Sequence, residues 1–246
     1  MSADDYGPGG GQEALTGGTA LVTGAGSGIG RAIACRLAAQ GMSVLLVGRR
    51  EHLLREAAAE AGGAARVLPS DVATAEGMAA VAAALPPALH VLVHSAGEFR
   101  YGPMERTTDA DWTALEAVNI RAPMLLTAAC LPALRAARGQ VVFVNSTAAL
   151  RSAPGAGAYV ATKHALRAAT DVLRQEVNAD GVRVLSVFPG RTDTPMQDAV
   201  LAAEGRQRNP DALLRPEDVA AMVLAALVLP RRAEVTDIIL RPARPM

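Results

Sequence analysis

Lysine is almost absent from this sequence. Of the 24 basic residues in the 246-residue chain, only Lys163 is a lysine, and the other 23 are arginines. A solvated ion pair or a phosphate clamp tolerates arginine, so a position that has kept lysine indicates a need for a compact ammonium group. Lys163 follows Tyr159 by four residues, which places both on one face of a helix. An ordinary packing pair at this spacing is the alternative interpretation.

Net charge and long apolar runs are also missing. The 24 acidic residues balance the 24 basic ones, and the isoelectric point is about 6.9. This balance favours neither nucleic acid nor an anionic membrane surface as a partner, and leaves small molecules and copies of the same chain. No segment has 18 consecutive apolar residues, so the sequence predicts no membrane-spanning helix.

Cysteine is scarce, and the two cysteines are far apart. Cys35 and Cys130 form no Cys-x-x-Cys motif and each falls in an apolar helical pattern, so we expect reduced core cysteines, no metal site and a cytoplasmic protein. Residues 1–18 have neither the basic start nor the apolar core of a signal peptide. We expect them to be a flexible leader before a single domain of residues 19–246.

Short apolar runs alternate with alanine-rich stretches from Thr19 onward, which predicts repeated β-α units and a doubly wound α/β fold. The near-continuous apolar character of the runs indicates strands covered by helices on both faces. The predicted strands are Thr19–Thr23, Ser43–Val47, Ala65–Pro69, Val91–His94, Gln140–Asn145, Val182–Phe188 and Val235–Leu240. The predicted helices are Ile29–Gln40, Glu51–Ala61, Thr74–Ala84, Asp109–Ala137, Ala156–Asn178 and Pro216–Leu227.

The two longest predicted helices, Asp109–Ala137 and Ala156–Asn178, are rich in alanine and leucine around their whole circumference. A single domain rarely needs both to be so apolar unless another subunit covers them, which predicts a homodimer or homotetramer. A codon bias toward alanine explains the composition equally well.

A glycine-rich turn joins the first predicted strand to the first helix. Its residues that would contact a dinucleotide are Gly24, Gly26, Ser27, Gly28, Ile29 and Gly30. Glycines at such a turn let the backbone approach a pyrophosphate held at the helix N-terminus. The position between a strand and an amphipathic helix is what makes dinucleotide binding the favoured interpretation.

The second predicted strand ends in Gly48, Arg49 and Arg50, with no acid until Glu51. A carboxylate at this place would favour NAD(H), whereas arginines next to a small residue favour the 2′-phosphate of NADP(H). We therefore expect NADP(H) to be preferred, with NAD(H) as the alternative if both arginines are merely solvated. After the third strand, Asp71, with Val72 beside it, is expected at the adenine; a helix cap is the other interpretation of Asp71.

Ser146 ends the fifth predicted strand, thirteen residues before Tyr159, and ligands bind at the carboxyl edge of open parallel sheets. With the glycine turn, Ser146 and Tyr159/Lys163 in this order, the chain resembles the short-chain dehydrogenase/reductase family, in its short single-domain branch, over roughly Thr19 to Arg241. The resemblance implies a doubly wound Rossmann fold with a seven-stranded parallel sheet flanked by helices. It also implies an oxidoreductase that interconverts a ketone and a secondary alcohol.

The resemblance further implies roles for single residues. Tyr159 would be the general acid/base, and the Lys163 ammonium would favour its phenolate and hold the nicotinamide ribose. Ser146 would bind the substrate oxygen, and Asn119 would support a water relay to the lysine; a helix-kink residue is the alternative for Asn119. Further cofactor contacts would come from Ala96, Gly97, Pro189, Gly190, Thr192 and Thr194.

The fourth-strand motif departs from the family's Asn-Asn-Ala-Gly, because His94 and Ser95 precede Ala96. We interpret His94 as structural, and expect the side-chain bonds that stabilise the central strand to differ.

Loops after the fourth, fifth and sixth strands should contact the substrate, and these are Glu98–Arg106, Thr147–Ala158 and Arg191–Arg208. Arg100, Arg151 and Arg191 suggest a hydroxy or keto acid, and solvated arginines are the alternative. A non-catalytic dinucleotide-binding sensor or scaffold remains the rival function.

Overall fold

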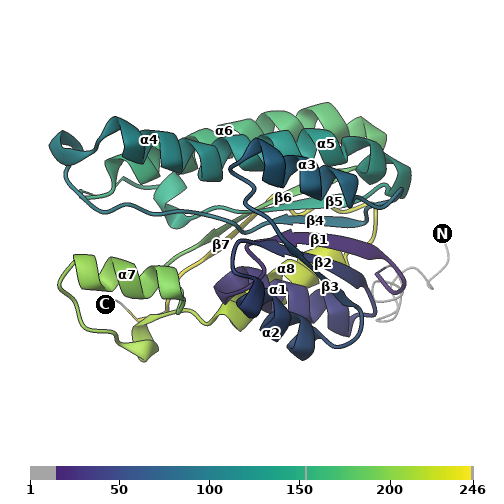
Figure 1. Cartoon of the computed structure of the whole chain (residues 1–246), viewed down its shortest axis with the longest axis horizontal. Helices are drawn as coiled ribbons and strands as arrows, with labels where there is room; N and C mark the ends of the chain where they lie inside the picture. The colour runs from purple at the N-terminus through teal and green to yellow at the C-terminus, as the bar shows by residue number, and fades with distance from the viewer. Residues whose placement is uncertain (1–14, 153, 245–246) are drawn as a thin grey trace.

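The computed structural model describes residues 15–152 and 154–244, and its centre is a parallel sheet (Figure 1). The strands are β1 (Thr19–Thr23), β2 (Ser43–Gly48), β3 (Ala65–Pro69), β4 (Val91–His94), β5 (Gln140–Val144), β6 (Arg183–Pro189) and β7 (Asp237–Leu240). They form one seven-stranded sheet in the order β3-β2-β1-β4-β5-β6-β7, with every pairing parallel. The predicted doubly wound sheet is therefore confirmed, and its order reverses between β1 and β4.

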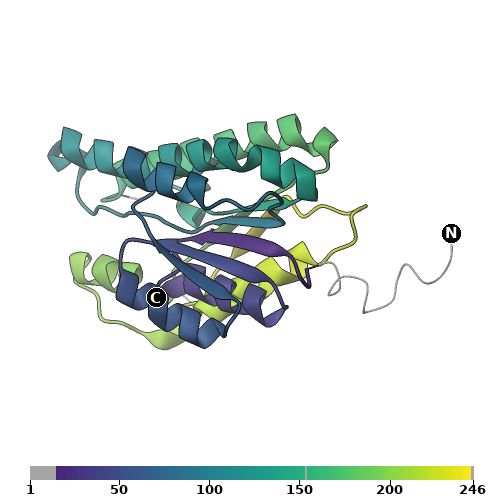
Figure 2. The same ribbon diagram turned by 45° about the vertical axis from the view of Figure 1, so that its right-hand side comes forward.

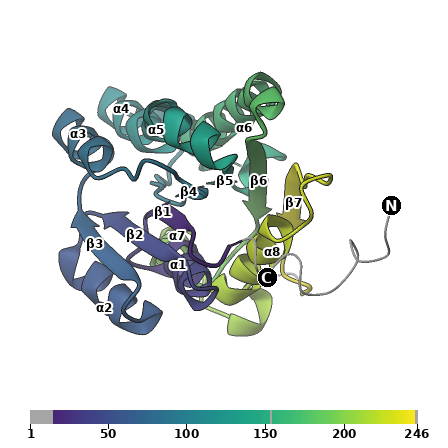
Figure 3. The same cartoon turned by 90° about the vertical axis from the view of Figure 1, so that its right-hand side faces the viewer.

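Helices cover both faces of this sheet. They are α1 (Gly28–Ala39), α2 (Glu51–Ala61), α3 (Ala75–Ala83), α4 (Asp109–Glu116), α5 (Ala122–Ala137), α6 (Gly157–Val177), α7 (Pro195–Ala203) and α8 (Pro216–Leu227). In Figures 1 and 3, α3, α4, α5 and α6 form one layer and α1, α2 and α8 the other, and the turned view in Figure 2 keeps the two layers apart. Helix α7 lies away from both layers, at the left of Figure 1.

The central strands are mostly apolar because their side chains are buried on both faces of the sheet. In β1, Leu21 packs into the core under α5 and α6, and Val22 packs into the core under α1 and α8; both are fully buried. Alternation of side chains across a strand explains why neighbouring apolar residues serve opposite cores.

The predicted helix Asp109–Ala137 is continuous in space but irregular inside. A π-helical turn, Ala117–Arg121, separates α4 from α5. By length and mean hydropathy (1.4) this 29-residue helix could cross a membrane, yet half of its most apolar stretch is buried inside the molecule. It serves here as a core helix of one layer.

The described chain is already packed at residue 15. Leu15 is buried in the core next to α1, and the Gly17 N–H donates to the Gly41 carbonyl at 3.0 Å. Of the expected leader, residues 1–14 lie outside the described residues, whereas residues 15–18 lie against the domain.

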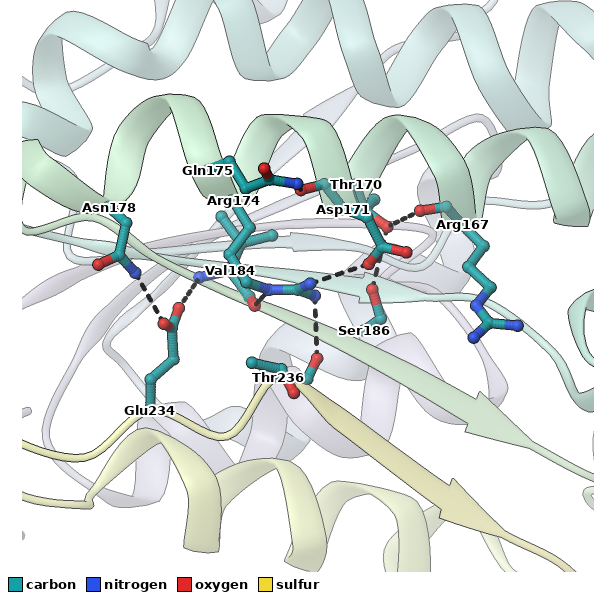
Figure 4. Close-up of polar contacts among 10 residues, drawn as sticks. All are labelled: Arg167, Thr170, Asp171, Arg174, Gln175, Asn178, Val184, Ser186, Glu234 and Thr236. Atoms are coloured by element: carbon teal, nitrogen blue, oxygen red, sulfur yellow. Dashed lines mark hydrogen bonds and ion pairs between the residues drawn. The ribbon is translucent and has the colours of Figure 1, made fainter.

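Side chains fasten the edge where β6 meets β7 (Figure 4). The Glu234 carboxylate accepts the Val184 N–H at 2.9 Å and the Asn178 side-chain amide at 2.7 Å. The Arg174 guanidinium donates to the Val184 carbonyl at 2.9 Å and the Thr236 carbonyl at 3.1 Å. These bonds satisfy backbone groups of β6 next to the start of β7. Strand β7 begins at Asp237, two residues later than predicted.

Candidate active site

A cleft of about 710 Å³ opens beyond the carboxyl ends of the strands. Its walls come from the β1–α1 turn, from the residues that follow β2 to β6, and from α6 and α7. The cleft includes the place where the sheet order reverses, which is where open α/β sheets bind their ligands. Of the residues predicted for the site, those that line it are Gly24, Gly26, Ser27, Gly28, Ile29, Arg49, Arg50, Asp71, Val72, Ala96, Gly97, Ser146, Tyr159, Lys163, Pro189, Gly190, Thr192 and Thr194.

Two residues predicted for the site, Gly30 and Asn119, are not among the residues of the described part of the chain that line the cleft. Gly30 lies one turn inside α1, directly against the start of the glycine turn. A Cβ atom at Gly30 would lie 2.4 Å from the Gly24 carbonyl oxygen and 2.9 Å from its carbonyl carbon. Gly24 itself has a φ of +67°, which favours glycine. Gly30 therefore contributes to the site indirectly, because its lack of a side chain lets the backbone of the glycine turn pack against α1.

Replacing Gly30 with alanine is expected to destabilise the protein by about 1–3 kcal/mol and to weaken dinucleotide binding, because the obstacle is backbone that cannot rotate away. Thermal melting and dinucleotide titration measure the two effects. The matched control is Gly63→Ala, since no atom lies within 4 Å of a Cβ there and its φ is not in the left-handed region. Equal melting temperatures for the two variants would contradict the argument.

The end of β2 presents arginines to the cleft. The Arg50 guanidinium donates to the Ser27 hydroxyl of the glycine turn at 3.3 Å, which places it beside that turn. Both Arg49 and Arg50 line the cleft, and so does Asp71 after β3. The Asp71 carboxylate accepts the Ala73 N–H at 3.0 Å, while the N-cap of α3 is Thr74. The helix-cap interpretation of Asp71 is therefore wrong.

Tyr159, Lys163 and Ser146 meet in one wall of the cleft, and all carry buried or half-buried side chains. Burial raises the pKa of the Tyr159 hydroxyl, and its hydrogen bond with Ser146 opposes that rise. Burial also lowers the pKa of Lys163 to about 8. The Lys163 ammonium lies 5.7 Å from the centre of the Tyr159 ring and donates to the Val144 carbonyl at 3.4 Å. Burial and Ser146 account for the direction of this shift, and the expectation that the Lys163 ammonium favours the Tyr159 phenolate stays a prediction.

Asn119 occupies the π-helical turn, and its side chain clamps the loop after β4. Its amide donates to the Glu98 carbonyl at 2.9 Å and to the Thr162 hydroxyl at 3.1 Å, and its oxygen accepts the Glu98 N–H at 2.9 Å. These bonds join the loop after Gly97 to α6, the helix of Tyr159 and Lys163. The irregular turn thus aims a polar side chain at the neighbourhood of the site.

The ends of β1 and β4 are joined by one hydroxyl. Thr23 Oγ1 accepts the N–H groups of Ser95 and Ala96 at 3.2 and 3.3 Å and donates to the Val93 carbonyl at 3.3 Å. In the altered fourth-strand motif, His94 Nε2 forms a hydrogen bond with Thr127 Oγ1 at 2.8 Å. The His94 ring stacks on Phe143 in the core, and burial lowers its pKa to about 3, so it is neutral and structural.

Two features of the cleft were missed from the sequence. Asn145, which precedes Ser146, donates to the Lys163 backbone carbonyl at 3.2 Å, and its own side-chain oxygen is buried without a partner within the described part of the chain. The second is α7, in a segment expected to be a loop; it contributes Met196, Gln197 and Val200 to the lining. The signal for α7 was the pair Thr194-Pro195, an N-cap followed by proline at the first helical position.

The loop arginines are not three free cations. Arg100 pairs with Glu98 and with Asp111 and is not part of the described lining. Arg191 lines the cleft but is paired with Glu204. The hypothesis of three arginines facing one cleft is therefore wrong for Arg100, whereas Arg151 and Arg191 do line the cleft, and the acid substrate itself stays a prediction.

Comparison with known proteins agrees with this geometry. The sequence model of the short chain dehydrogenase family matches residues 18–205. The chain is 32% identical to an uncharacterized oxidoreductase of Staphylococcus epidermidis, over 91% of this chain and 96% of that protein.

Solved structures superpose over almost the whole chain. An alcohol dehydrogenase from the archaeon Thermococcus sibiricus, complexed with 5-hydroxy-NADP, has a TM-score of 0.82 and 28% identity, covering 93% of this chain and 99% of that one. A 3-ketoacyl-(acyl-carrier-protein) reductase from Brucella melitensis, complexed with NADH, has a TM-score of 0.82 and 27% identity, covering 94% of this chain and all of that one.

The parallel sheet, its glycine turn and the cleft at its reversal define a Rossmann-type oxidoreductase. With the family match across residues 18–205, the chain belongs to the short-chain dehydrogenase/reductase family and is an NAD(P)-dependent enzyme of it.

Proposed function

We propose that this enzyme is an NADP(H)-preferring oxidoreductase that interconverts a carbonyl group and a secondary alcohol by hydride transfer, with Tyr159 as general acid/base. The observation that carries the proposal is the meeting of Tyr159, Ser146 and Lys163 in the same cleft as the glycine turn. Proton donor, oxygen-binding hydroxyl and dinucleotide turn are thus within one enclosed space.

The residues of the cleft fit a nicotinamide dinucleotide. A Cβ atom at Gly28 would lie 2.8 Å from the Thr194 side chain, so the glycine turn and the segment after β6 close around the same space. The residues that would hold the dinucleotide are those of the glycine turn, Ala96, Gly97, Pro189, Gly190, Thr192 and Thr194. When bound, the nicotinamide ring supplies or receives the hydride. The similar archaeal and Brucella proteins were solved with 5-hydroxy-NADP and NADH, which supports a cofactor of this class.

The side chains of this enzyme handle the proton. In reduction, the Tyr159 hydroxyl gives its proton to the carbonyl oxygen, and in oxidation its phenolate accepts the proton of the alcohol. Burial raises the pKa of Tyr159 because it disfavours the charged phenolate. Ser146 holds the substrate oxygen against Tyr159. Lys163 would hold the ribose of a bound dinucleotide, and Asn119 positions α6 through Thr162.

The preference for NADP(H) is tested by titration with NADPH and NADH. Energy transfer from Trp112, which packs in the cluster that contains Tyr159, reports binding. We expect NADPH to bind about 10-fold tighter, and Arg49→Ala to remove most of that difference, because a guanidinium pairs with the 2′-phosphate. Arg66→Ala, an exposed arginine on β3 outside the described lining, is the control. Tighter binding of NADH would contradict the preference and leave Arg49 a surface residue.

A dinucleotide-binding sensor or scaffold would bind both cofactors without turnover, so a carbonyl-reduction assay separates it from the enzyme.

The proposal also includes a cytoplasmic homodimer or homotetramer. Its support is that Leu125 on α5 and Val172 on α6 are 55% and 54% exposed, and that both described cysteines are free. Light scattering of the purified protein measures the assembly.

A further inference from the structure

The part of the cleft next to Tyr159 is lined by apolar side chains from two separate segments, the loop after β4 and helix α7. The Phe99 ring meets the Tyr159 ring edge to face, with centres 4.9 Å apart and planes at 70°. Tyr101 and Met196, both in the lining, keep 47% and 39% of their surface exposed. Val200 of α7 also lines the cleft. Apolar surface left open inside a cleft is what a hydrophobic ligand would cover.

This apolar wall is held in place by backbone contacts between two loops. The Gly102 N–H donates to the Gly155 carbonyl at 2.8 Å, which pairs the loop after β4 with the loop before α6. The Tyr101 ring lies directly on Gly155: a Cβ atom there would be 2.8 Å from the ring. Gly155 has a φ of +79°, so the backbone conformation also favours glycine. The aromatic surface is therefore a fixed part of the cleft.

The charge of Arg191, in the segment before α7, is already paired with a carboxylate. One nitrogen of Arg191, Nη2, donates to both carboxylate oxygens of Glu204 at 2.8 Å. The two side chains are only 31% and 19% exposed, and both line the cleft. The other nitrogen, Nη1, is buried with no partner in the described parts of the chain, so Glu204 is what holds this guanidinium. Arg151 also lines the cleft, but it is exposed to solvent.

We propose that the substrate is an uncharged ketone, or the corresponding alcohol, whose larger substituent is an apolar ring or chain lying against Phe99, Tyr101 and Met196, and that Glu204 excludes acids by occupying Arg191. This rests on the function proposed above. A substrate carboxylate that entered beside Glu204 would lose water and meet a second carboxylate, and the Arg191 guanidinium there is already paired. A neutral aryl ketone loses little on desolvation and gains the aromatic wall.

Two ketones of nearly equal shape test the charge. Para-acetylbenzamide and para-acetylbenzoate share the reacting carbonyl and differ only in an uncharged amide against a carboxylate. For the wild-type enzyme with NADPH, we expect kcat/KM for the amide to exceed that for the acid at least about 10-fold, and to exceed that for acetone by a similar factor.

The substitution Glu204→Gln tests whether Glu204 causes the discrimination against acids. It frees the Arg191 guanidinium, so we expect the ratio of kcat/KM between acid and amide to rise about 10-fold. Asp180→Asn is the matched control: it removes the same charge from an ion pair with Arg135 that lies outside the described lining, and should leave the ratio unchanged. Phe99→Ala should lower the advantage of the amide over acetone about 10-fold, which tests the aromatic wall even if the Glu204 variant does not fold.

A kcat/KM for the acid that equals that for the amide would overturn the proposed substrate class. A kcat/KM for acetone as high as that for either aryl ketone would also overturn it. A Glu204 variant that folds and keeps the wild-type ratio overturns the role of Glu204. Absence of turnover for every carbonyl compound, with dinucleotide binding intact by Trp112 energy transfer, contradicts instead the oxidoreductase function on which the inference rests.

Discussion

Tyr159→Phe is expected to lower kcat for carbonyl reduction by about 10³-fold, while the dissociation constant for the dinucleotide changes little. The ring stays in its buried place and keeps its edge contact with Phe99. Only the hydroxyl is lost, and with it the proton that the carbonyl oxygen must receive and the hydrogen bond with Ser146. Single-turnover absorbance of NADPH measures the chemical step, and Trp112 energy transfer measures binding.

Two results would separate this role from a structural one. A normal melting temperature with unchanged dinucleotide affinity shows that the lost hydroxyl acts in the reaction and not in the fold. A variant with the wild-type kcat would overturn Tyr159 as the acid/base, whatever its effect on stability.

Lys163→Arg is expected to lower kcat about 10²-fold although it conserves the positive charge. Only 4% of Lys163 is exposed, and its ammonium lies near the Val144 carbonyl and over the Tyr159 ring. A planar guanidinium is wider and cannot take that position without moving α6 or β5. Steady-state kinetics with saturating dinucleotide measures the loss.

The control for Lys163 exchanges the same two residue types where space is free. Arg55→Lys, in an exposed ion pair with Glu51 on α2, should keep the wild-type kcat. If Lys163→Arg also retained full activity, the single lysine of this sequence would have no special chemical role.

The sequence predicted the sheet well because each central strand is buried on both faces and therefore reads as an uninterrupted apolar run. β1, β3 and β4 have the predicted bounds, as do α2 and α8. The glycine turn was predictable because Gly30 packs so close to the Gly24 carbonyl that any side chain would clash, and this requirement shows in the sequence as glycine.

What escaped prediction depends on contacts between distant segments. Helix α7 is short, and nothing in the sequence showed that Arg191 and Glu204, at its two ends, would pair. The burial that raises the Tyr159 pKa was not predicted, since the sequence shows the neighbouring lysine but not the packing around the hydroxyl. The clamp made by Asn119 likewise requires the π-helical turn, which has no clear signature of its own.

The cleft has two walls that are built differently. Thr23 joins the ends of β1 and β4 through uncharged hydrogen bonds to the backbone, which fix the start of the glycine turn next to Ala96. The segments on either side of α7 are joined to each other by two ion pairs, Arg191 with Glu204 and Arg208 with Asp193. Dissolved salt weakens partly exposed ion pairs and leaves uncharged backbone bonds nearly untouched. We therefore expect dissolved salt to loosen the segments that flank α7 more than the junction of β1 and β4.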